Sequence, residues 1–156
     1  MSAYDTLRPH VGANRLGTVI LDETAEDARY GGFVVGLSAT FVVLQNVEDW
    51  REDGMTIFPL DRVHGFEFDA TDEERTVIAN WRRIVPRNLD PWLDLSDWPA
   101  LFTSLKGRVN VVGVCDGNDA EVGEIVDIAA ARITQLPRRV PLAAPIDHRD
   151  RKAAIA

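Results

Sequence analysis

The sequence has few cysteines and no long apolar run, the features on which disulfide-bonded and membrane-spanning proteins depend. It contains one cysteine, Cys115, so no internal disulfide can form and a reducing, cytoplasmic setting is expected. No apolar run approaches the roughly 20 residues that a membrane helix needs. Residues 2–22 have neither the basic start nor the apolar run of a signal peptide. We therefore expect a cytoplasmic protein with no membrane partner.

Histidine is also scarce, and its three copies form no metal motif. No two histidines stand at a ligand spacing and Cys-x-x-Cys is absent, so zinc is not expected. The segments Asp116–Ala120 and Asp49–Gly54 begin like calcium loops but lack the required oxygen ligands. Cys115 ends an apolar run and His64 lies within a strand pattern, where structural roles are expected. We predict no metal, no cofactor and no catalytic residue.

Acidic residues, by contrast, are abundant and unevenly distributed. The net charge is −8; residues 1–100 hold 18 acids and 9 bases, whereas residues 101–156 hold 7 acids and 8 bases. An acidic surface repels phosphate backbones and attracts basic partners. The charge therefore favours a basic protein as the partner.

The stretch 31–68 organises the rest of the chain. Its run Phe33–Leu44 is too apolar for a sheet with one solvated face, and suits strands packed on both faces or a tightly curved barrel. The small residues Ser38–Thr40 mark a hairpin corner. We expect strands over 16–21, 28–37, 40–46, 55–58 and 63–68, an acidic loop over 22–27, a long hairpin loop over 47–54 and a tight turn over 60–62.

Two helices are predicted after these strands. Thr71 and Glu74 form a capping box, and the spacing predicts a helix over roughly 72–85 with one apolar face. That face consists of Val77, Ile78, Trp81, Ile84 and Val85. A packed linker over 87–97 leads to a short helix that Ser96 or Asp97 caps and that Gly107 ends. Residues 1–15 show no clear period and suit an arm or a short helix.

The last third reads as a second set of strands, over 109–115, 121–128, 132–136, 140–142 and 146–149, followed by a frayed helix or tail over 151–156. It matches the first third in order: Gly32–Leu44 parallels Gly123–Gln135, each a hairpin around three small residues. Later, Pro59-Leu60 parallels Pro141-Leu142. The matching order of strand, small corner, strand and Pro-Leu predicts an internal repeat.

Each copy, with five short strands and its longest hairpin at strands two and three, resembles the small Sm-like or SH3-like barrel. The resemblance implies a mainly β fold with helices, built as two tandem five-stranded barrels bridged by two short helices. The corresponding units are 16–86, the linker 87–107 and 108–156. Sm-like proteins read RNA with an Asp and an Asn beside the strand 2–3 corner and with an Arg-Gly pair; here Leu37–Phe41 and Arg62-Val63 stand there instead. The RNA pocket is therefore not expected.

The candidate site is the acidic hairpin loop, with one tryptophan among carboxylates. It comprises Glu48, Asp49, Trp50, Arg51, Glu52 and Asp53. Trp and Arg are common in interface hot spots, and an acidic rim steers a basic partner. The alternative is that Trp50 folds back on the barrel and the charges are only solvated. The first function predicted is non-catalytic binding of a basic protein, as by a bacterial immunity or inhibitor protein that neutralises a toxin such as a nuclease.

Two other functions remain open at this point. A nucleic-acid-binding Sm-like regulator would use the basic end of the chain, Arg132, Arg138, Arg139, Arg149, Arg151 and Lys152. A hydrolase would need a pair of carboxylates in a pocket, which no spacing in the sequence identifies. A homodimer paired edge to edge is compatible with such small barrels.

Overall fold

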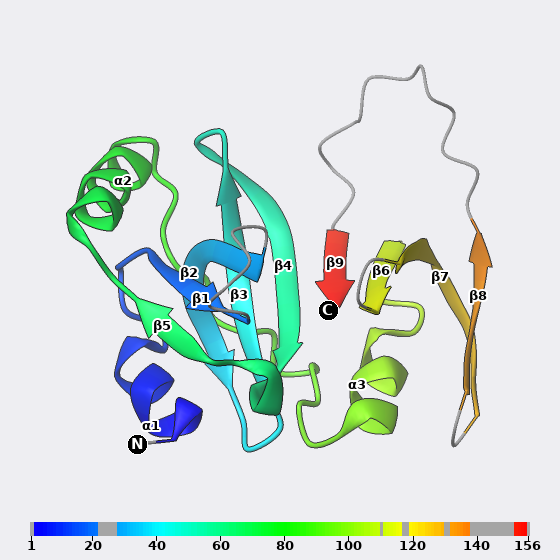
Figure 1. Cartoon of the computed structure of the whole chain (residues 1–156). Coiled ribbons are helices and arrows are strands. Elements are labelled where there is room, and N and C mark those ends of the chain that lie inside the picture. The colour runs from blue at the N-terminus through cyan, green and yellow to red at the C-terminus, as the bar shows by residue number, and fades with distance from the viewer. Residues whose placement is uncertain are drawn as a thin grey trace.

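The computed structural model describes residues 2–21, 28–109, 111–116, 119–129, 132–137 and 152–155, and all its strands form one sheet (Figure 1). The strands, in chain order, are β1 (Gly17–Ile20), β2 (Arg29–Leu37), β3 (Phe41–Glu48), β4 (Arg51–Pro59), β5 (Gly65–Glu67), β6 (Val111–Asp116), β7 (Asp119–Ala129), β8 (Arg132–Pro137) and β9 (Lys152–Ile155). The helices are α1 (Ala3–Leu7), η1 (Arg8–His10), η3 (Leu60–Arg62), α2 (Ala70–Trp81) and α3 (Trp98–Leu105). The fold is therefore mainly β with helices, as predicted.

The first five strands form an antiparallel sheet in the order β5-β1-β2-β3-β4. This sheet is not closed, because β4 pairs in parallel with β9 and has no pairing with β5. On its other side β9 pairs in parallel with β6, the first strand of the β6-β7-β8 meander. Figure 1 shows β9, in red, between the two antiparallel parts. The frayed helix or tail predicted for 151–156 is wrong, since Lys152–Ile155 is a strand.

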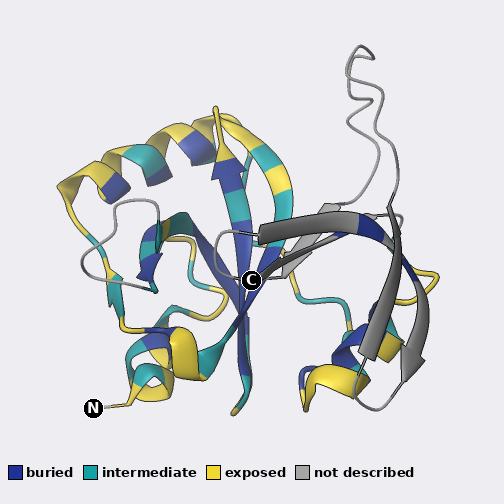
Figure 2. Cartoon of the chain, turned by 45° about the vertical axis from the view of Figure 1, so that its right-hand side comes forward, coloured by how far each residue is buried: buried dark blue, intermediate teal, exposed yellow. Residues whose placement is uncertain are grey.

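The first sheet is buried on both faces, as the apolar run predicted. Successive residues of β2 and β3 alternate between two apolar clusters: Phe33, Phe41 and Val43 lie in one, while Val34 and Val42 lie in the other. In Figure 2 the central strands are almost wholly buried. The sequence left an arm or a short helix open for residues 1–15, and the structure has the helix α1, whose Leu7 lies in the second cluster.

The first apolar cluster extends beyond this sheet. It includes Leu101, Phe102 and Leu105 of α3, together with Val112 of β6 and Ile125 of β7. The side chain of Asp97 caps α3 by accepting from the Ala100 amide at 2.8 Å, which confirms one of the two caps predicted. The linker before α3 also packs as predicted: Leu95 is buried in the same cluster, and the Ser38 hydroxyl donates to its carbonyl at 2.7 Å.

The two hairpins that the sequence matched have the same register. In the β2–β3 pair the register shifts directly after Val34, and in the β7–β8 pair it shifts directly after Ile125. When Gly32 is matched to Gly123, these two shifts fall at the same position. Each is a β-bulge, in which one extra residue of the first strand faces its partner strand. The predicted strands over 140–142 and 146–149 and the loop over 22–27 lie outside the described residues.

Candidate functional site

The predicted site lies at the end of the β3–β4 hairpin, but its loop is much shorter than expected. Strand β3 continues to Glu48 and β4 begins at Arg51, so the turn consists of Asp49 and Trp50 alone. Both have positive φ, 46° and 59°. Two left-handed residues make the type I′ turn, whose twist matches that of the flanking strands. The loop over 47–54 is therefore wrong, and most of these residues belong to a strand pair.

Gly54 explains why the sequence signal was misleading. Asp-Gly is a common turn pair, and Gly54 does have a positive φ of 79°. It lies inside β4, however, where the register slips between the pairs Gln45–Met55 and Val47–Glu52. The glycine thus permits a bulge in β4, and the chain turns at Asp49-Trp50, four residues before Asp53-Gly54.

Most of the charges at this end are exposed. Glu48, Asp49, Arg51 and Asp53 are exposed, and Trp50 is 37% exposed at the tip. Glu52 is half-buried and its carboxylate pairs with the Arg87 guanidinium at 2.8 Å. This ion pair joins β4 to the segment that follows α2. We call Glu48, Asp49, Trp50 and Asp53 the acidic tip.

Gln45 fixes the same segment from inside the sheet. Its side chain is fully buried, and its amide nitrogen donates to the Val85 carbonyl at 3.1 Å. Its amide oxygen accepts from the Arg87 backbone N–H at 2.8 Å. The side chain thus forms both hydrogen bonds that a neighbouring strand would form, and it holds Val85–Arg87 against β3. No feature of the sequence singles out this glutamine.

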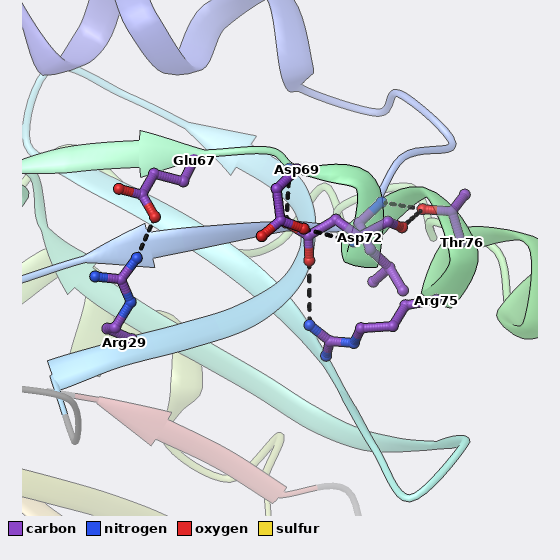
Figure 3. A network of polar contacts seen from close by, with 7 residues as sticks. Arg29, Glu67, Asp69, Asp72, Arg75 and Thr76 are labelled. Carbon is purple, nitrogen blue, oxygen red and sulfur yellow. Dashed lines mark hydrogen bonds and ion pairs between the residues drawn. The ribbon is translucent and has the colours of Figure 1, made fainter.

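Helix α2 begins two residues earlier than predicted and uses a different capping box (Figure 3). The Asp69 carboxylate accepts from the Asp72 amide at 3.0 Å, and the Asp72 carboxylate accepts from the Asp69 amide at 3.3 Å. The Thr76 hydroxyl donates to the Asp72 carbonyl at 2.6 Å and accepts from the Leu16 amide at 2.9 Å. The Thr71–Glu74 box is therefore wrong; these polar contacts fix α2 to the chain entering β1.

Asp72 is an ionisable group that is almost wholly buried. Burial raises the pKa of its carboxyl above the ordinary value of 3.8, although its hydrogen bond with Asp69 and its ion pair with Arg75, at 3.2 Å, act in the opposite direction. A second ion pair nearby joins Arg29 to Glu67, across β2 and β5 (Figure 3). These groups hold the elements together.

We predict that Asp72 makes the stability of the folded chain depend on pH. A raised pKa means that the folded chain binds this proton more tightly than the unfolded chain. The contribution of this group to the free energy of unfolding therefore decreases as the pH rises from about 3.8 through the folded pKa. In Asp72→Asn this decrease is absent, since the amide does not titrate. Denaturant titrations over roughly pH 3.5 to 7 measure it.

Glu73→Gln serves as the matched control for this prediction, because it removes the same charge from an exposed position on the same turn. We expect its pH profile to run parallel to that of the unmodified chain. Equal changes of slope in the two variants would mean that net charge, not the burial of Asp72, sets the pH dependence.

Of the apolar face predicted for this helix, the residues that lie on α2 point away from the protein, whereas Ile84, beyond its end, packs against the first apolar cluster. The positions that face the sheet are Asp72, Thr76 and Ala79, which are buried. On the outer side of the helix, Val77 is 68% and Trp81 79% exposed, and Val85, in the segment after the helix, is 50% exposed. Figure 2 shows exposed residues along the outer side of this helix. The predicted end near residue 85 is wrong: the helix ends at Trp81, because Arg83 has a left-handed φ of 62° that breaks the helical path.

The remaining candidates from the sequence are scattered. His64 is exposed, and the side chain of Cys115 lies outside the described part. Within the residues that the structure describes, no three His, Cys, Asp or Glu side chains are grouped to hold a metal ion. Of the six basic residues near the C-terminus, Arg132 opens β8 and Lys152 opens β9. The other four lie outside the described residues.

No protein-family model matches this chain, and neither the curated proteins nor the solved structures contain a match. In the described part of the chain, the helices are too short and too polar to cross a bilayer. The chain is a mixed β protein with short helices.

Proposed function

We propose that the chain is a non-catalytic protein-binding module that takes a basic protein partner at the acidic tip. The observation that supports this is the tight β3–β4 turn, which places Trp50, 37% exposed, beside the exposed carboxylates of Glu48, Asp49 and Asp53. A two-residue turn is rigid, so little conformational entropy is lost when a partner covers it. Tryptophan supplies a large contact area, and the surrounding carboxylates steer a cationic surface.

The conformation of Trp50 supports the same proposal. A bulky residue with a φ of 59° costs roughly 1 kcal/mol relative to glycine. Asn-Gly is the pair that best stabilises a type I′ turn, so turn stability does not explain a tryptophan here. Strain of this kind is often found where a side chain serves recognition. The most concrete form of the proposal is a cytoplasmic immunity or inhibitor protein that neutralises a basic toxin such as a nuclease.

The double variant Asp49→Asn/Trp50→Gly tests the site without weakening the fold. It installs the preferred turn pair, so we expect the free energy of unfolding to rise by about 1 kcal/mol. Its affinity for the partner should nevertheless fall about 30-fold, the loss typical of a hot-spot residue. The partner is first captured from native lysate at low and at high salt, and affinities are then measured with the purified pair.

The matched control removes two exposed carboxylates elsewhere, in Asp61→Asn/Glu73→Gln, and leaves the acidic tip intact. We expect this control to bind within about threefold of the unmodified chain, because screened surface charges contribute little. Unchanged affinity in the turn variant, or equal losses in both variants, would place the binding surface elsewhere.

We further propose that the two halves are copies of one unit, the arrangement implied by the resemblance to tandem small β-barrels. The equivalent bulges in β2 and β7 support it. So does the pairing of the neighbouring strands: Gly32 pairs with Gly17 of β1, and Gly123 pairs with Val112 of β6. A helix precedes each meander, and in each case a glycine with a φ near 70° stands five residues before the paired position. These glycines are Gly12, at 70°, and Gly107, at 72°.

A further inference from the structure

The outer face of α2 is an apolar surface that no described part of the chain covers. It consists of Val77, Ile78 and Trp81, which we call the α2 patch. The opposite side of the helix is already fixed to the first sheet through Asp72, Thr76 and Ala79. The helix therefore cannot rotate to bury the α2 patch without breaking these contacts. Several large apolar side chains gathered on one exposed face are typical of an interaction surface.

The charges on α2 suggest what covers this surface. Glu73 and Glu74 lie in its first turns, while Arg82 and Arg83 follow its last. None of these four residues forms an ion pair within the described part of the chain. The helix is therefore acidic at one end, basic at the other and apolar along the middle. A second such helix, running in the opposite direction, would present the complementary sequence of charges.

The spacing of the charges along α2 allows two identical helices to pair in this way. Glu74 and Arg82 each lie four residues from Ile78, one toward each end of the helix. A twofold axis beside Ile78 therefore places Glu74 of each copy opposite Arg82 of the other. Two-fold interfaces use the same patch on both subunits and must be self-complementary in this way. A helix of 12 residues can satisfy both ion pairs along its exposed face.

We propose that the α2 patch is the interface of a homodimer, in which two α2 helices pack antiparallel around Ile78 and Trp81. This surface shares no residue with the acidic tip, so the proposal does not depend on the identity of any other partner. One short helix from each copy makes a small interface, and we therefore expect a dissociation constant in the micromolar range.

Sedimentation velocity on the full chain, from about 5 to 500 µM, measures the oligomeric state directly. The unmodified chain should change from monomer to dimer within this range. Trp81→Glu should remain monomeric throughout, because it places a charge at the centre of the interface. Since Trp81 is 79% exposed, its replacement is not expected to disturb the fold, and circular dichroism checks this.

A charge-reversal cycle tests the antiparallel arrangement itself. Glu74→Arg and Arg82→Glu should each weaken the dimer at least tenfold, since each brings two like charges together twice. The double variant Glu74→Arg/Arg82→Glu should recover to within threefold of the original dissociation constant. Each reversal opposes the helix dipole, and the double variant opposes it most. Recovery therefore reports the contact between copies and not a stronger helix.

The control for this cycle is Asp61→Arg, an equal change of charge at an exposed position outside α2. It should dimerise as the unmodified chain does. A chain that stays monomeric at every concentration overturns the proposal, and so does a double variant that remains as weak as the single ones. Either result would mean that the α2 patch does not join two copies of the chain in the antiparallel arrangement.

Discussion

Replacing Gly32 with alanine is expected to lower the free energy of unfolding by about 3 kcal/mol, the upper part of the range for an overpacked site. A Cβ at this position would lie 2.5 Å from the backbone oxygen of Gln45, on the neighbouring strand β3. Because that atom belongs to the backbone of a central strand, it cannot rotate away as a side chain would. The β2–β3 pair must separate at this point, and chemical denaturation measures the cost.

Gly65→Ala is the matched control for this prediction. A Cβ there would meet only Cδ1 of Ile20, at 3.8 Å, which is an ordinary contact. We expect a change between zero and about 1 kcal/mol of added stability, because alanine reduces the freedom of the unfolded chain. A loss at Gly32 no larger than the effect at Gly65 would show that the two strands have room for a side chain.

Gln45→Met should also cost about 3 kcal/mol, although the two side chains have similar volumes. The variant removes the hydrogen bonds to the Val85 carbonyl and the Arg87 amide, and a fully buried thioether replaces neither. Two lost hydrogen bonds and the incomplete hydration of their former partners account for this amount. We expect faster hydrogen exchange at the Arg87 amide, together with the lower denaturation midpoint.

Gln45→Glu separates the two bonds through pH. An ionised carboxylate can accept from the Arg87 amide but cannot donate to the Val85 carbonyl, whereas the protonated acid can do both. Burial favours the protonated form in the folded chain, so this variant should gain stability relative to Gln45→Met as the pH falls. If the difference in unfolding free energy between the two variants does not change with pH, the hydrogen bonds of the Gln45 side chain do not hold Val85–Arg87 in place.

Local sequence patterns predicted the helices and strands accurately where each element is stabilised by residues close together in the sequence. The Ser38–Thr40 corner and the strands on either side follow from the run of β-branched and aromatic residues that precedes and follows it. The cap of α3 is a contact between Asp97 and a residue three positions later. Each of these features needs only neighbours in the sequence, which explains why reading the sequence was sufficient.

The acidic tip was predicted as a set of residues but not as a geometry. A turn at Asp49 and Trp50 requires two residues other than glycine to adopt positive φ. The pairing of the long strands β3 and β4 imposes this conformation on them. The only glycine nearby, Gly54, is used for a bulge instead. Strand pairing over many residues outweighed the local preference for a turn at Asp53-Gly54.

The sequence by itself determined the positions of most strands, the presence of a helix near 72–85 with an apolar stripe, and the acidic balance. Only the tertiary structure decided that this stripe faces outward and that the last strand lies between β4 and β6. The reason is the distance in sequence of the contacts involved: Thr76 bonds to Leu16, 60 residues away, and Arg87 to Gln45, 42 residues away. A periodic pattern specifies that a face is apolar, whereas the partner that covers it is specified by residues elsewhere in the chain or in another molecule.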